Sequence, residues 1–119
     1  MPLTPRIIAF SAAVEAERSV PEAQRVLAGE PQLTVWNHYT EASGQFFAGV
    51  WAATRGRWLV RYTEHEFCHL RAGLVVLTSE EGERMEFGRG DSFVVPAGFV
   101  GTWEVLEECR KLYAIFEAR

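Results

Sequence analysis

Residues 63–77 read TEHEFCHLRAGLVVL, and the shape of their backbone decides the fold. The five residues from His65 to His69 match the pattern H-E-x-x-H, which on a helix binds zinc through its two histidines. Here the neighbouring side chains are largely β-branched or aromatic, Gly73 follows closely, and the β-prone run LVVL comes next. We therefore predict a strand. On a strand the two imidazoles lie ~13 Å apart, at ~3.3 Å per residue, which is too far for one zinc ion.

Alternation along this strand separates its side chains into two faces. Glu66 shares one face with Cys68 and Leu70, whereas His65 and His69 lie on the other. If the face of Glu66 is the inner one, its carboxylate is costly unless it is paired, protonated or bound to a ligand. Two interpretations follow: Glu66 is a structural group hydrogen-bonded to a neighbouring Arg, Tyr or Trp, or it is a functional group in a cavity.

The chain from Leu33 onward shows the same β-prone texture. Short runs such as LTVWNHYT, RWLVRYT and RKLYAIFEA alternate with Gly, Pro or acidic turns at nearly regular spacing. This rhythm predicts an all-β antiparallel sandwich or barrel in one continuous domain. We expect residues 33–119 to form the barrel. Residues 1–32 are expected to form an N-terminal extension with a strand or a short helix that begins at Pro21.

Composition narrows the classes of function. The chain has 119 residues, 48% of them hydrophobic, without an apolar run near the ~20 residues of a membrane span. The N-terminus lacks the basic start and apolar stretch of a signal peptide, so we expect a cytoplasmic protein without a membrane partner. A net charge of −4 disfavours nucleic acid as a partner. The two cysteines, Cys68 and Cys109, are expected to be reduced thiols rather than a disulfide framework.

Two short motifs carry a family resemblance. The stretch GDSFVVPAG has Gly90, five residues, Pro96, one residue and Gly98. Earlier in the chain, Glu66 is followed by six residues and Gly73. In their order and spacing these stretches resemble the second and first motifs of the cupins. The resemblance implies a double-stranded β-helix, which is a jelly-roll barrel.

The closer resemblance is to small single-domain cupins of the DUF861 type. They are related to the cupin domains of ureidoglycine aminohydrolases and of an ethanolamine-utilisation protein. The similarity runs from about Leu33 to Glu117, and many members of this group have no assigned activity. The resemblance therefore implies the fold rather than a reaction. It also implies a homodimer, in which the N-terminal extension can contact the neighbouring subunit and cover an edge strand.

The resemblance indicates where a metal would bind, and the residues there do not fit one. Metal-binding cupins place two histidines just before the Glu and a third soon after the second motif. Only Glu66 of the four ligands is present here, and one carboxylate cannot hold a catalytic zinc, iron or manganese ion. We therefore predict no metal and no other cofactor. The positions that would have to be histidine are Leu59 and Arg61, or Val60 and Tyr62 at a shorter spacing, and Gly101.

A cavity in such a barrel would combine aromatic walls with a few polar anchors. Glu66 is the candidate catalytic residue. Cys68 is a candidate for the pocket, although a buried thiol without a basic neighbour is inert. The basic stretch ECRKLY, residues 108–113, is expected to be a solvated strand edge. The candidate pocket residues are Trp51, Arg61, Tyr62, Cys68, Trp103 and Tyr113.

Three functions fit these features. The first is a metal-free cupin that binds a small polar organic molecule in the barrel. The second is an enzyme acting on a small amide- or carboxylate-bearing metabolite, with Glu66 as general base and Arg61 or Tyr62 stabilising developing charge. The third is a dimeric scaffold with a vestigial cavity. The sequence offers one acid–base group and no evident nucleophile, which ranks the enzyme below the binding protein.

Overall fold

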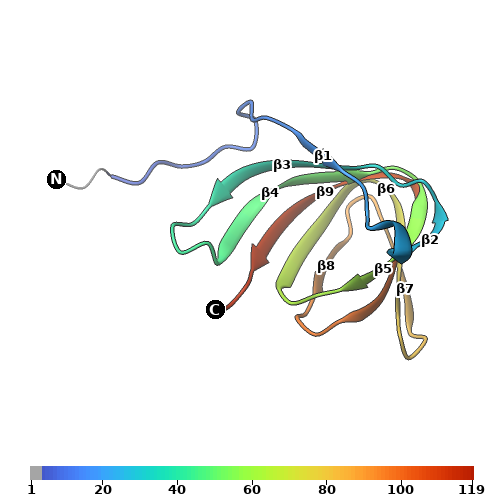
Figure 1. The fold of residues 1–119 in the computed structure, drawn as a ribbon. Helices are drawn as coiled ribbons and strands as arrows, with labels where there is room; N and C mark the ends of the chain where they lie inside the picture. The colour runs from blue at the N-terminus through green and yellow to red at the C-terminus, as the bar shows by residue number, and fades with distance from the viewer. Residues whose placement is uncertain (1–3) are drawn as a thin grey trace.

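The computed structural model describes residues 4–119, and this part of the chain is built almost entirely of antiparallel strands (Figure 1). They join one curled sheet, which confirms the predicted all-β class and is consistent with a jelly-roll barrel. No helix in this part is long and apolar enough to cross a membrane. The elements along residues 4–119 are β1 (Glu17–Ser19), η1 (Ala23–Arg25), β2 (Val26–Gly29), β3 (Leu33–Thr40), β4 (Phe46–Ala53), β5 (Gly56–Arg61), β6 (His65–Ser79), β7 (Arg84–Gly88), β8 (Ser92–Val95) and β9 (Val100–Phe116).

Two long strands, β6 and β9, organise the sheet because they pair with each other along nearly their whole length. The first half of β6 also pairs with β8, and its second half pairs with β7. The second half of β9 pairs with β4, and its first half pairs with β5. Each long strand therefore passes from one layer of the barrel to the other, and the sheet curls around an interior.

Gly73 lies where β6 makes this passage. The register between β6 and β9 shifts on both sides of it, between Leu70 and Val75. Gly73 has a φ of 93°, and a Cβ atom placed on it would lie 2.4 Å from the carbonyl oxygen of Glu108 on β9. The bend therefore depends on a residue without a side chain.

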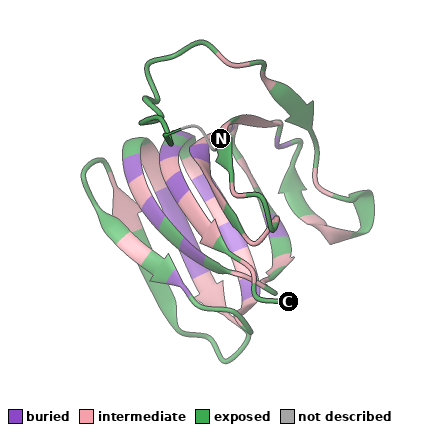
Figure 2. Cartoon of the chain, turned by 90° about the vertical axis from the view of Figure 1, so that its left-hand side faces the viewer, coloured by how far each residue is buried: buried purple, intermediate pink, exposed green. Residues whose placement is uncertain are grey.

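The alternation predicted for residues 65–70 is confirmed. His65 begins strand β6, so the H-E-x-x-H stretch is not helical. Glu66, Cys68 and Leu70 are buried, whereas Phe67 is 46% exposed on the outer face. Figure 2 shows the buried residues concentrated on the central strands of the sheet. The hydrophobic core is made of Ala53, Trp58, Cys68, Leu70, Val75, Leu77, Val95, Trp103, Val105 and Cys109.

The N-terminal segment reaches both edges of the sheet. Strand β1 pairs with β3, and β2 pairs with β5. Between them, the segment that follows Pro21 holds the three-residue 3-10 helix η1. Residues 1–3 of the expected extension lie outside the described part. The first residues after them extend away from the sheet (Figure 1), and Phe10 then stacks on His38 of β3 with ring centroids 4.6 Å apart. A homodimer stays a prediction; large exposed side chains on the outer sheet face would suit it, among them Phe46, Phe67, Val94 and Phe116.

Candidate functional site

The concave face of the sheet bounds a cavity of about 1080 Å³. Strands β3, β4, β5 and β9 and the start of β6 supply its walls, and residues 14–25 of the N-terminal segment supply part of its rim. Of the residues predicted for the site, Trp51, Arg61, Tyr62, Glu66, Trp103 and Tyr113 contribute to its lining. Cys68 does not; it is fully buried next to Lys111. The cavity therefore brings together side chains from distant parts of the sequence.

Lys111 forms a buried ion pair with Glu66. The Nζ atom of Lys111 lies 2.9 Å from Oε2 of Glu66, and the two residues are only 3% and 5% exposed. Lys111 points inward because β9 alternates, with Cys109 and Tyr113 on the same buried face and Arg110 on the exposed one. The expectation of a solvated strand edge at residues 108–113 is therefore wrong: this stretch lies in a central strand, between β4 and β6.

Two indole rings enclose the ammonium group of Lys111. Its Nζ atom lies 4.4 Å from the ring centroid of Trp51 and 4.3 Å from that of Trp103. The two rings meet edge to face, with centroids 5.5 Å apart. Cation–π attraction of this kind is strongest where water is excluded, so the rings help to hold the charge that Glu66 neutralises.

The pKa of Lys111 depends on two opposing effects, burial and the charge of Glu66. Burial pushes the pKa down, but the negative charge of Glu66 and a hydrogen bond to it outweigh that effect, and the pKa is raised. Lys111 is therefore a cation at neutral pH. Because the folded-state pKa is raised, the stabilisation is fully present below the ordinary value of 10.5 and is lost as the pH rises through the folded value.

Two phenols complete the polar part of the cavity. Burial raises the pKa of Tyr62 well above its usual value, and the charge of Glu66 raises it further. Burial also raises the pKa of Tyr113 to about 12, with smaller effects of Glu66 and Glu17. The Tyr113 hydroxyl donates a hydrogen bond of 2.6 Å to Oδ1 of Asn37. Both phenols are therefore neutral donors near an ion pair.

The structure resolves which of two neighbours faces inward at the end of β5. Tyr62 is half-buried and packs edge to face against Phe99. Arg61 is exposed and lines the cavity only at its mouth. Tyr62 is therefore the inner polar group of this pair, and Arg61 belongs to the rim.

The residues of the cavity do not fit a metal ion. Within residues 4–119, no three His, Cys, Asp or Glu side chains lie close enough together to hold one. His65 stacks on Phe116 and accepts a hydrogen bond from the Ala97 amide, and His69 contacts Ser92. Both imidazoles therefore belong to the outer face, and the carboxylate of Glu66 is already paired with an ammonium group.

Cys68 lies against the ion pair. Its Sγ atom is 3.6 Å from Nζ of Lys111, and burial raises its pKa to about 12 despite that cation. Burial raises the pKa of Cys109 in the same way, to about 11. Both thiols are buried. They therefore lack both properties of a reactive cysteine, the thiolate form and access to solvent.

We expect neither cysteine to react with a thiol reagent in the folded protein at pH 8. Colorimetric titration should detect no thiol in native buffer and both thiols after unfolding in guanidinium chloride. The unfolded chain serves as the control, because its thiols have pKa values near the ordinary ~8.5. Rapid labelling of Cys68 under native conditions would show that the cavity wall opens.

Sequence reasoning missed Lys111 and the rim of the cavity. Tyr113 was placed in the wall, and the two-residue period of a strand puts Lys111 on the same face. That signal was available in the stretch KLY. The rim residues of the N-terminal segment, such as Glu17, gave no comparable signal, because their position depends on pairing with β3.

Comparison with known proteins agrees with the fold and the motifs. Residues 40–113 match the family model described as the EutQ-like cupin domain. No curated protein matches the sequence. Among solved structures, the chain is similar to a DUF861-family protein of unknown function from Pseudomonas syringae, with 26% identity and a TM-score of 0.79. The match covers 91% of this chain but 46% of that one, so this chain spans just under half its length.

Two further solved structures share the fold at lower identity. A putative ethanolamine utilization protein Q from Salmonella typhimurium is 22% identical, with a TM-score of 0.64 over 73% of this chain and 71% of that one. The EutQ protein of Clostridium difficile is 17% identical, with a TM-score of 0.66 over 84% and 81% of the two chains. The matched residues 40–113 make up more than half of the sequence and include both motifs. The chain belongs to the family of EutQ-like cupin domains.

Proposed function

We propose that this cupin binds a small polar organic molecule in its barrel without a metal ion. The observation that carries the proposal is the Lys111–Glu66 pair, which is buried yet contributes to the lining of the cavity. Burying two charges is costly, and an apolar pair of similar volume would serve packing alone as well. A pair retained at a cavity wall is therefore more easily explained by a ligand than by stability.

The surroundings of the pair match what small-molecule sites share. Such sites are concave and largely apolar, with a few convergent polar groups, and have volumes of roughly 300–1,000 Å³. Here Trp51, Trp58 and Phe47 supply apolar wall, and the hydroxyl of Tyr62 supplies a donor. The cavity of about 1080 Å³ is large enough for a metabolite-sized molecule.

The same geometry weighs against Glu66 as a general base. To accept a proton from a substrate, Glu66 would have to give up its ion pair and leave the Lys111 ammonium buried without a counter-charge. A ligand that the pair helps to orient requires no such loss. Binding therefore ranks above catalysis for this cavity.

A blocking variant tests the proposal without knowledge of the ligand's polar contacts. A panel of small carboxylic acids, amides, ureides and amines is screened by thermal shift, and hits are titrated by tryptophan fluorescence. Val35 lines the cavity from β3, so Val35→Phe should fill part of it and weaken any hit by about tenfold or more. Val94 is an exposed position on β8, and Val94→Phe is the matched control.

Val35→Phe and Val94→Phe are expected to differ in their effect on the affinity for a ligand. Val94→Phe should leave the affinity of every hit within about twofold of the original protein, because outer-face substitutions rarely matter. A panel without any hit would contradict ligand binding and favour the scaffold. Hits that Val35→Phe leaves unchanged would place the ligand outside the barrel.

A further inference from the structure

The cavity is lined by more carboxylates than cations, although it holds a buried lysine. Five glutamates contribute to its lining, against two arginines and Lys111. The carboxylates are those of Glu15, Glu17, Glu22, Glu64 and Glu66. An excess of one sign around a concave site with low-dielectric walls raises the local concentration of oppositely charged solutes.

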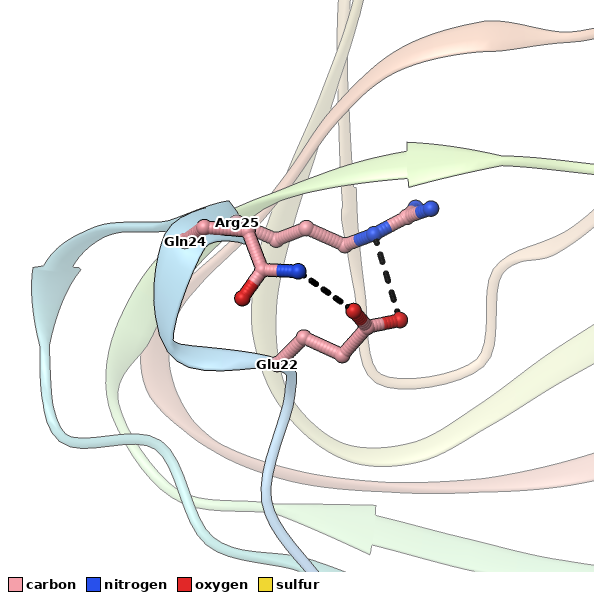
Figure 3. A network of polar contacts seen from close by, with 3 residues as sticks. All are labelled: Glu22, Gln24 and Arg25. Carbon is pink, nitrogen blue, oxygen red and sulfur yellow. Dashed lines mark hydrogen bonds and ion pairs between the residues drawn. The ribbon is translucent and has the colours of Figure 1, made fainter.

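Two of these carboxylates are already neutralised. Glu66 is paired with Lys111 at 2.9 Å. Glu22 lies 3.7 Å from Nε of Arg25 and accepts a hydrogen bond from Gln24, as Figure 3 shows. The charges of these two pairs cancel to a first approximation, so they do not decide the sign of the field in the cavity.

The remaining lining charges are three carboxylates and one guanidinium. Glu17 is held on β1 opposite Val35, and Glu64 lies between β5 and β6, where its Oε1 accepts the amide hydrogen of Thr63. Arg61 is the single cation left among the lining residues of the described part, and it is exposed. The mouth of the cavity therefore has an excess of negative charge.

The two tyrosines of the wall, Tyr62 and Tyr113, are also affected by the negative charge of the rim. Burial is the main cause that raises the pKa values of Tyr113 and Tyr62; the charge of Glu17 adds a smaller contribution at Tyr113, and that of Glu64 a smaller one at Tyr62. Around these phenols the protein disfavours an added negative charge. The negative potential of the two rim carboxylates favours a cation there.

Resting on the proposed binding function, we infer that the ligand is a small organic cation whose ammonium or similar group is attracted by the rim glutamates Glu17 and Glu64 and packs against the aromatic wall. A carboxylate would meet repulsion from both glutamates, and Lys111 offers it little because Glu66 and two indole rings already surround that ammonium. The remaining aromatic surface, which includes Trp58, suits the apolar part of such a molecule.

Three probes of one shape test the charge. Cyclohexylmethylamine, cyclohexylmethanol and cyclohexanecarboxylate differ mainly in charge and do not absorb where tryptophan is excited. Calorimetry and tryptophan fluorescence at pH 7 and low salt should give an affinity for the amine about tenfold above that for the alcohol, and the weakest affinity for the carboxylate. The preference should shrink in 0.5 M salt, because the rim glutamates are reached by solvent.

A charge-matched pair of variants locates the effect. Glu17→Gln/Glu64→Gln should lower the affinity for the amine to within about threefold of that for the alcohol. The affinity for the alcohol itself should not change. Glu80→Gln/Glu81→Gln makes the same change in net charge at the exposed β6–β7 turn and should keep the preference for the amine. Equal loss in both variants would make the preference a property of overall charge and overturn the inference.

The remaining outcomes separate this inference from the function on which it rests. Equal binding of all three probes, or tightest binding of the carboxylate, would overturn the cationic ligand and leave the binding cavity standing. Failure of every probe to bind, together with an empty metabolite screen, would overturn both.

Discussion

Replacing Lys111 by methionine is expected to lower the free energy of unfolding by about 3–5 kcal/mol. Methionine retains most of the length of lysine and can still contact the two indole rings, so packing changes little. The loss comes from Glu66, which is left as a buried carboxylate without a counter-charge. Chemical denaturation at pH 7 measures it, since Lys111 is a cation there in the original protein.

A double variant distinguishes the lost charge balance from lost packing. In Lys111→Met/Glu66→Leu both charges are gone and apolar groups of similar volume remain, so stability should return to within about 2 kcal/mol of the original protein. A double variant less stable than the single one would mean that each side chain acts independently, and the ion pair would not be the feature that matters.

The fold was predictable because its determinants are local. Spaced glycines and Pro96, with two-residue alternation around Glu66, specify turns and a half-buried strand whatever the rest of the chain does. Alternation placed Glu66 and Cys68 on the same face of the strand, and both are buried. The start of β3 at Leu33 likewise coincides with the change in composition.

The site was less predictable because its parts meet through long-range pairing. Lys111 and Glu66 are brought together when β9 pairs with β6, and the basic character of the stretch around Lys111 suggested solvent instead. The bend between β5 and β6 interrupts the period, so the inward choice of Tyr62 over Arg61 was open. Glu17 lies at the rim because β1 pairs with three residues of β3, and no sequence motif predicts that pairing.

The second large loss of stability is expected for Gly73→Ala. At a φ of 93° an L-residue is disfavoured by about 1–2 kcal/mol. In addition, the new Cβ would lie 2.4 Å from the Glu108 carbonyl oxygen and 2.6 Å from Cα of Cys109, both of which are backbone atoms that cannot rotate away. We expect a total loss of about 3 kcal/mol or more, because forced overpacking adds about 1–3 kcal/mol to the cost of the backbone angle.

Two other glycines separate these contributions. Gly82 has a φ of 94° with nothing within 4 Å of its added Cβ, so Gly82→Ala should cost only the 1–2 kcal/mol or so of the backbone angle. Gly101 has no such angle, but its Cβ would lie 2.0 Å from the Thr78 carbonyl oxygen, so Gly101→Ala measures the clash alone. Denaturation of the three variants should give the largest loss for Gly73→Ala. If Gly73→Ala costs no more than Gly82→Ala, β6 and β9 can separate at the bend, and the close crossing is not what curls the sheet around the cavity.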